Sequence, residues 1–136
     1  SAMRKALAFA GVTADQINYV CAHATSTLAG DLAEAKAIGS VFRDRLDSLP
    51  VSSPKALAGH SLSMSGVLDL ALCCLMLDEG FILGNANLKN VDTGCQHLFL
   101  PVETEQSDLS WILNNSSGFG GSNVCNVLKK IQKNVS

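Results

Sequence analysis

The sequence has no excess of charge, no CxxC pair and no apolar run long enough to cross a membrane. Ten basic and twelve acidic side chains leave a net charge of −2, which argues against nucleic acid as a partner because that partner selects a basic surface. The five cysteines are odd in number, so neither a disulfide framework nor a zinc site is indicated. We therefore expect a cytoplasmic protein with reduced thiols and no metal.

The longest apolar stretch, residues 62–77, is shorter than a membrane span of about 20 residues and contains Asp69. We expect a buried helix there, no membrane span, and no signal peptide at the start of the chain. Charged residues make up only 16% of the sequence and hydrophobic residues 47%, which indicates that one face meets a partner. Nothing divides residues 1–136, so we predict one domain.

The hydrophobic pattern predicts an α/β layered fold. Residues 80–90 show no period and are predicted to form an irregular crossing loop. The predicted helices are residues 3–10, 30–42 and 61–79, and the predicted strands are residues 17–22, 51–53, 98–103, 111–115 and 123–129.

Two histidines and a lysine stand at the predicted ends of these elements. His23 directly follows a strand, and His60 precedes a helix, with Lys55 five residues before it. Functional side chains gather on such loops, and two neutral imidazoles aimed at one point stabilise a developing oxyanion. A hydrogen-bonded structural role is the usual interpretation of a single histidine, but the matching positions of this pair favour a site.

Four polar residues near His23 complete the candidate set. Lys55 needs a carboxylate partner if it is buried, and Asp31 and Glu34 are the candidates. Their alternative role is that of acids in the first turns of a helix. Thr25 and Thr27 alternate along an extended stretch, so their hydroxyls are placed to bind an extended ligand arm, although β-propensity alone also explains them.

A glycine-rich segment follows the predicted strand at residues 111–115. Gly118, Gly120 and Gly121 surround Phe119, and because glycine permits positive φ and close backbone approach, the phenylalanine is placed to act as a gate. A phosphate-binding loop is the competing interpretation. It is disfavoured because no lysine follows at P-loop spacing and the next element is a strand.

Together these motifs resemble the β-ketoacyl-acyl-carrier-protein synthases, in order and at similar spacing. The resemblance runs from about Met3 to Lys130 and favours the elongating, two-histidine branch. It implies a thiolase-like fold, of which this chain is the C-terminal half, a mixed sheet packed against helices. The motifs are His23-Ala24-Thr25-Ser26-Thr27 with Gly30-Asp31, Lys55 with Gly59-His60-Ser61-Leu62, and residues 115–123.

The resemblance implies an acyltransferase of fatty-acid or polyketide biosynthesis. Such a 3-oxoacyl-[acyl-carrier-protein] synthase joins malonyl-carrier protein to an acyl thioester by decarboxylative Claisen condensation. His23 and His60 match its catalytic histidines, and Lys55 its lysine, with Glu34 as the paired carboxylate. The implied supporting and substrate-binding residues are Asp31 and the gate Phe119, then Thr25 and Thr27 along the pantetheine arm, with Gly118 and Gly120 beside them.

The implied partners are acyl carrier protein, the N-terminal half of the synthase and a second subunit in a full-length homodimer. Substrates travel on the carrier's phosphopantetheine, with no separate cofactor. The family's nucleophilic cysteine belongs to the other half, and none of the five cysteines matches its motif, so we expect the chain to be inactive alone.

Two other functions compete with this interpretation. One is a non-catalytic, chain-length-factor-like partner subunit or scaffold. The other is a degradative thiolase, which two histidines with Lys55 suit less well. Ala24 replaces a common glycine, Leu28 a frequent proline and Ser117 a phenylalanine; Ser122 stands for threonine or histidine. No catalytic group is lost, but Ser117 leaves the preferred acyl length open.

Overall fold

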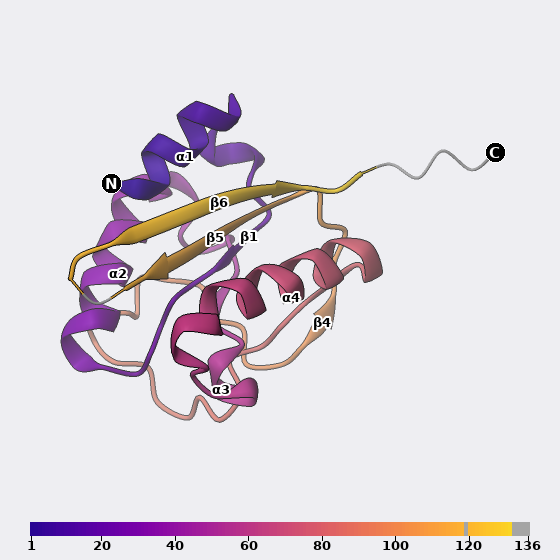
Figure 1. The fold of residues 1–136 in the computed structure, drawn as a ribbon. Helices are drawn as coiled ribbons and strands as arrows, with labels where there is room; N and C mark the ends of the chain where they lie inside the picture. The colour runs from indigo at the N-terminus through magenta and orange to yellow at the C-terminus, as the bar shows by residue number, and fades with distance from the viewer. Residues whose placement is uncertain (119, 132–136) are drawn as a thin grey trace.

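The computed structural model describes residues 1–118 and 120–131, which form a four-stranded mixed sheet with helices on both faces (Figure 1). The strand order is β2-β1-β5-β6. The first three strands run parallel, and β6 is antiparallel to β5. The sheet strands are β1 (Tyr19–Cys21), β2 (Val51–Ser52), β5 (Trp111–Ser117) and β6 (Asn123–Lys129). The predicted mixed sheet packed against helices is confirmed.

Two helices cover each face of this sheet. On one face lie α1 (Ala2–Ala10) and α2 (Leu28–Val41); on the other lie the short α3 (Lys55–Ala58) and α4 (Ser65–Glu79) (Figure 1). Gly11 ends α1 in the left-handed conformation, φ 65°, and its amide reaches back into the last turn. Within the described part of the chain, no helix combines the length and apolarity needed to cross a membrane.

The alternation of side chains along the strands divides the core in two. Val20 and Leu113 point into a cluster under α1 and α2, which includes Leu7 and Ile38. The strand residues next to these in sequence, Tyr19, Cys21 and Ile112, point to the other face. There they pack against Cys73 and Met76 of α4. Because both faces are covered, the central strands are apolar at consecutive positions.

The predicted strand at residues 98–103 is wrong. Phe99 makes only an isolated parallel bridge with Pro50, and Pro101 cannot donate to a ladder. The side-chain amide of Asn85 replaces the missing pairing by donating to the carbonyls of Val51 and Pro101, both at 3.0 Å. A small second sheet forms instead from β3 (Phe81–Ile82), inside the predicted irregular loop, and β4 (Glu105–Gln106).

A buried hydroxyl chain ties the sheet to the segment after β3. Ser52 Oγ donates to the carbonyl of Leu83 at 2.6 Å. Because a serine hydroxyl has one proton, the 2.6 Å contact between Tyr19 Oη and Ser52 Oγ is donated by the tyrosine. Both side chains are buried.

We predict that Ser52→Ala destabilises the protein more than Tyr19→Phe does. The serine variant leaves the Tyr19 hydroxyl and the Leu83 carbonyl unpaired, at a cost of about 1–3 kcal/mol per buried group. The phenylalanine variant keeps the bond from Ser52 to Leu83. Urea unfolding at neutral pH measures both costs, and an equal or larger cost for Tyr19→Phe would contradict the assigned donor direction.

Candidate active site

Parallel pairing of β1 and β2 brings the two predicted histidines together. His23 lies just after β1, and His60 lies just after α3, the short helix that follows β2. Their ring centroids are 5.7 Å apart, with the ring planes at 86°. His23 is half-buried and His60 is exposed. The two imidazoles meet edge to face, one at the carboxyl end of β1 and the other after the short helix that follows β2.

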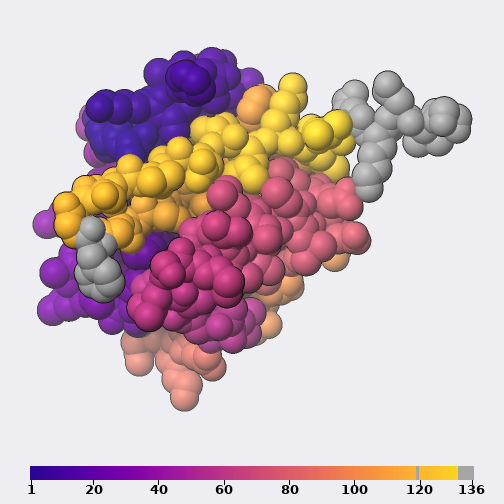
Figure 2. Space-filling view, in the orientation of Figure 1, coloured from indigo at the N-terminus to yellow at the C-terminus, as the bar shows by residue number. Residues whose placement is uncertain are grey.

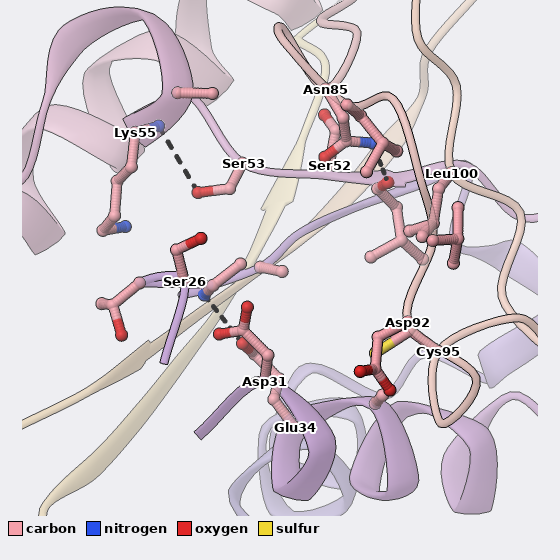
Figure 3. A pocket seen from close by; sticks show the side chains of 18 of the residues that line it. Ser26, Asp31, Glu34, Ser52, Ser53, Lys55, Asn85, Asp92, Cys95 and Leu100 are labelled. Atoms are coloured by element: carbon pink, nitrogen blue, oxygen red, sulfur yellow. Dashed lines mark hydrogen bonds between the residues drawn. The ribbon is translucent and has the colours of Figure 1, made fainter. Parts of the chain in front are cut away.

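A cavity of about 780 Å³ opens beside this pair, between α2, the end of β2 and the irregular segment of residues 85–100. Thr25, Thr27 and His60 line it, together with Lys55. Figure 3 shows Asp31 and Glu34 reaching toward the cavity from α2, opposite Ser53 and Lys55. The Thr25 and Thr27 hydroxyl oxygens lie 3.4 Å apart, so they present a continuous polar edge to the cavity.

The carboxylate partner of Lys55 is Asp69, not Glu34 or Asp31 as the sequence predicted. Lys55 Nζ lies 2.7 Å from Asp69 Oδ2, and both side chains are almost fully buried. Asp69 comes from α4, on the other face of the sheet from α2, where Asp31 and Glu34 lie. The sequence carried one signal for it: Asp69 is the single acid within the otherwise apolar run of residues 65–77.

Glu34 holds the backbone after β1 instead. One oxygen accepts the His23 amide at 2.8 Å and the Asn115 side-chain amide at 2.6 Å, and the other accepts the Ala24 amide at 2.8 Å. Asn115, which lies in β5 and is buried, was not predicted in this role. The carboxylate therefore joins α2, β5 and the strand end that carries His23.

Asp31 holds the next part of the same loop. Its carboxylate accepts the amide of Ser26 (Figure 3), while its Oδ1 atom is buried without a hydrogen-bond partner. Burial raises the pKa of Asp31, and the nearby Glu34 carboxylate raises it further, while the bond from the Ser26 amide opposes the rise. The two supporting acids thus act on the backbone of residues 23–26.

The electrostatics favour a neutral His23. Burial lowers its pKa below the ordinary 6.5, and the positive charge of Lys55 lowers it further. Its Nδ1 is buried without a hydrogen-bond partner, which also disfavours a second ring proton. A neutral imidazole keeps one N–H, which can donate to a developing negative charge.

The described glycines of the glycine-rich segment lie between β5 and β6. Gly118 follows β5, and Gly120 and Gly121 take positive φ values of 83° and 85° in the turn before β6. Neither Gly118 nor Gly120 is among the described residues that line the cavity. Phe119, the predicted gate, lies outside the described residues. In the ranges 1–118 and 120–131, no group of three or more His, Cys, Asp and Glu side chains could hold a metal ion.

The model of one protein family, described as the C-terminal domain of beta-ketoacyl synthases, matches residues 1–89. The chain belongs to this family. It is 36% identical over 129 residues to 3-oxoacyl-[acyl-carrier-protein] synthase 2 of Coxiella burnetii (strain RSA 493 / Nine Mile phase I), covering 95% of this chain and 31% of that protein. It is 39% identical over 116 residues to synthase 1 of Escherichia coli (strain K12), covering 85% and 28%.

Solved structures of ketosynthases share the fold. A beta-ketoacyl synthase from Burkholderia phymatum STM815 superposes with a TM-score of 0.89 at 33% identity, over 96% of this chain and 31% of that one. The ishigamide ketosynthase/chain length factor gives a TM-score of 0.88 at 32% identity, over 94% and 31%. The thiolase-like fold of these enzymes is therefore confirmed, and the chain spans less than a third of the curated relatives described above.

We predict that Asp69→Leu destabilises the fold by about 3–5 kcal/mol, because it leaves the buried Lys55 ammonium without a counter-charge. The double variant Lys55→Met with Asp69→Leu removes both charges and recovers most of that loss. Chemical unfolding of the two single variants and the double variant measures the coupling. If the losses in unfolding free energy of the two single variants simply add up in the double variant, Asp69 is not the charge partner of Lys55.

We predict that His23 titrates below 6.5 in the folded protein, with stability lost on acidification. Below that pH the unfolded chain binds more protons at this site than the folded one, so the contribution of neutral His23 is complete above 6.5 and disappears as the pH falls. Asp31, with a raised pKa, acts with the opposite sign.

Urea unfolding from about pH 7.5 to 5.5 tests this slope, with His23→Gln as the control that removes the titrating ring. NMR titration of the ring supplies the midpoint directly. A His23 midpoint above 6.5, or an identical slope in the control, would contradict the assignment.

Proposed function

We propose that this chain supplies the histidine and lysine part of the active site of an elongating β-ketoacyl-acyl-carrier-protein synthase. The observation that carries the proposal is the edge-to-face pair of His23 and His60, with centroids 5.7 Å apart beside a cavity. Family membership supports the reaction class. The chain is one domain of that enzyme, and its partner is the part that holds the nucleophilic cysteine.

The two imidazoles act on the malonyl thioester. N–H groups of His23 and His60 donate to its carbonyl oxygen, so the electron pair of the breaking bond to the carboxylate is stabilised as an enolate while carbon dioxide leaves. The enolate carbon then attacks the acyl thioester on the cysteine, and the cysteine thiolate is released. The lowered pKa of His23 supports this role, because the ring stays neutral near pH 7.

Lys55 and the two threonines prepare the site. The pair of Lys55 with Asp69 fixes the start of α3, whose end carries His60. Thr25 and Thr27, with their hydroxyl oxygens 3.4 Å apart on the cavity wall, hydrogen-bond the amides of the pantetheine arm. Substrates reach this cavity on the phosphopantetheine of an acyl carrier protein, and no separate cofactor takes part.

Four of the chain's five thiols support a nucleophile from elsewhere, and the fifth, Cys74, is exposed on α4, which packs on the opposite face of the sheet from α2. Cys21 and Cys73 are fully buried. Burial raises the pKa of Cys95, and it raises the pKa of Cys125 to about 12. Because the thiolate is the reactive form, these environments suppress nucleophilic attack near neutral pH.

An exposed apolar face next to His60 supports a protein partner. The space-filling view shows α4 uncovered along one side of the molecule, beside β6 (Figure 2). The exposed apolar side chains of α3, α4 and the turn between them are Leu57, Leu62, Met64, Val67 and Leu75. A patch of this kind marks an interaction surface. We assign it to the cysteine-bearing part of the synthase, within a homodimeric enzyme.

A non-catalytic partner subunit is the second candidate function. It is favoured by two similar solved structures, each described as a ketosynthase with a chain length factor. The adjacent His23 and His60 argue for catalysis, because a subunit that only binds a partner has no need of two imidazoles at one point. The residue at the nucleophile position of the partner decides between them: cysteine indicates an enzyme, and glutamine or another residue indicates a partner subunit.

We predict that the chain becomes part of an acyltransferase only when the cysteine-bearing part is added. The N-terminal part of the E. coli synthase 1 serves as the probe, with an acyl-carrier-protein thioester as donor. Intact-mass spectrometry should show acylation of that part alone, and malonyl-carrier protein should then yield the condensed product.

His23→Ala and His60→Ala variants supply the control. They should leave acylation intact and abolish decarboxylation and condensation, since the histidines act on the malonyl group. Acylation of one of the five cysteines of this chain would overturn the proposal.

A further inference from the structure

The loop of residues 23–27 has two residues in a strained backbone conformation. Ala24 has φ 29° and Ser26 has φ 63°, in a region that L side chains avoid because Cβ approaches the backbone. Neither residue is a glycine, which takes such angles without this cost. Such strain persists only when surrounding contacts fix the backbone, so the loop must be held from outside.

Two carboxylates on one face of α2 hold it. Glu34 accepts the amides of His23 and Ala24, and Asp31 accepts that of Ser26 (Figure 3). Asp31 and Glu34 are three positions apart on the helix, which places them on the same side. Each strained residue therefore has its own amide bound by a carboxylate.

The carboxylate–amide bonds are the main support of the loop, because the side chains of the loop itself contribute few hydrogen bonds. Asn115 donates to Glu34 at 2.6 Å and so fixes the direction of that carboxylate. Thr27, the residue before α2, makes no side-chain bond to cap the helix. Thr25 and Thr27 contact only each other among the side-chain hydrogen bonds of the described residues.

We propose that Glu34 and Asp31 are positioning residues, a paired clamp that keeps Ala24 and Ser26 strained. The clamp thereby aims His23 at His60 and turns Thr25 and Thr27 toward the cavity. Glu34 holds the half with Ala24, and Asp31 holds the half with Ser26. The importance of His23 rests on the proposed function. The clamp itself is a property of this chain and is measured without a substrate.

The clamp is tested by combining each carboxylate variant with each of two glycine variants and asking which glycine restores the native structure. Glu34→Gln and Asp31→Asn each weaken one half, and Ala24→Gly and Ser26→Gly each remove the strain of one half. Ala24→Gly should restore the native His23 ring signals in Glu34→Gln but not in Asp31→Asn. Ser26→Gly should restore the native Thr25 and Thr27 signals in Asp31→Asn but not in Glu34→Gln. Ring and methyl NMR of the chain read out both pairs.

The pKa of His23 separates positioning from a merely structural role. Glu34→Gln and the double variant Ala24→Gly with Glu34→Gln carry the same charge, so a difference between them reports only where the ring lies. In Glu34→Gln the His23 ring should move toward water, so its pKa should be higher. In the double variant the ring should return to its place, and its pKa should fall again. Equal values, or rescue by either glycine in both backgrounds, would overturn the proposal.

Ala24→Gly alone covers the case in which Glu34→Gln does not fold. With both carboxylates present it should raise the thermal midpoint and leave the His23 ring signals unchanged; a lower midpoint would contradict the strain. These results do not depend on condensation. If the reconstituted enzyme fails to condense its substrates but the glycine variants still restore the NMR signals as expected, the proposed function is overturned and the clamp still stands.

Discussion

The buried ion pair of Lys55 with Asp69 is the constraint on which the site depends. Both side chains are almost fully withdrawn from water, 2.7 Å apart, and a charge in that position is tolerated only with its partner. The pair fastens α3 to α4, and the backbone between them carries His60. The position of the exposed histidine is thus set by two charges that solvent does not reach.

The acids of the site lie on opposite faces of the sheet and have different partners. Asp69 approaches from the α4 side and neutralises Lys55, while Asp31 and Glu34 approach from the α2 side and bind amides. Between them, the parallel ends of β1 and β2 bring His23 and His60 into contact. An acid on either face therefore controls one of the two histidines: Asp69 through Lys55, and Glu34 through the backbone of His23.

The sequence predicted well whatever depends on local pattern. It predicted the α/β layers, the main strands and the positions of the two histidines, His23 after a strand and His60 before a helix, because periodicity and turn residues report those features. It placed the start of the long helix too early, since residues 62–64 form a 3₁₀ turn before α4 begins at Ser65. Family resemblance supplied the reaction class, which spacing alone does not contain.

The wrong predictions concern contacts between distant elements. Glu34 and Asp69 are both acids on helices that flank Lys55 in the sequence. Only the topology shows that Asp69, and not Glu34, lies on the same side of the sheet as Lys55. The same limit explains Asn85, whose side-chain amide replaces the strand predicted at residues 98–103. The strain at Ala24 is also a tertiary effect, because it exists only while Glu34 holds the amide.

The account's central claim is that His23 and His60 donate to one carbonyl oxygen. Isotope-edited infrared spectroscopy tests this most directly, with a ¹³C-carbonyl amide analogue of malonyl-pantetheine bound to the chain assembled with a cysteine-bearing partner. The account predicts a carbonyl stretch at lower frequency than in water, shifting partly back in either single histidine variant and fully in the double variant. A frequency that is the same in all four proteins would contradict it.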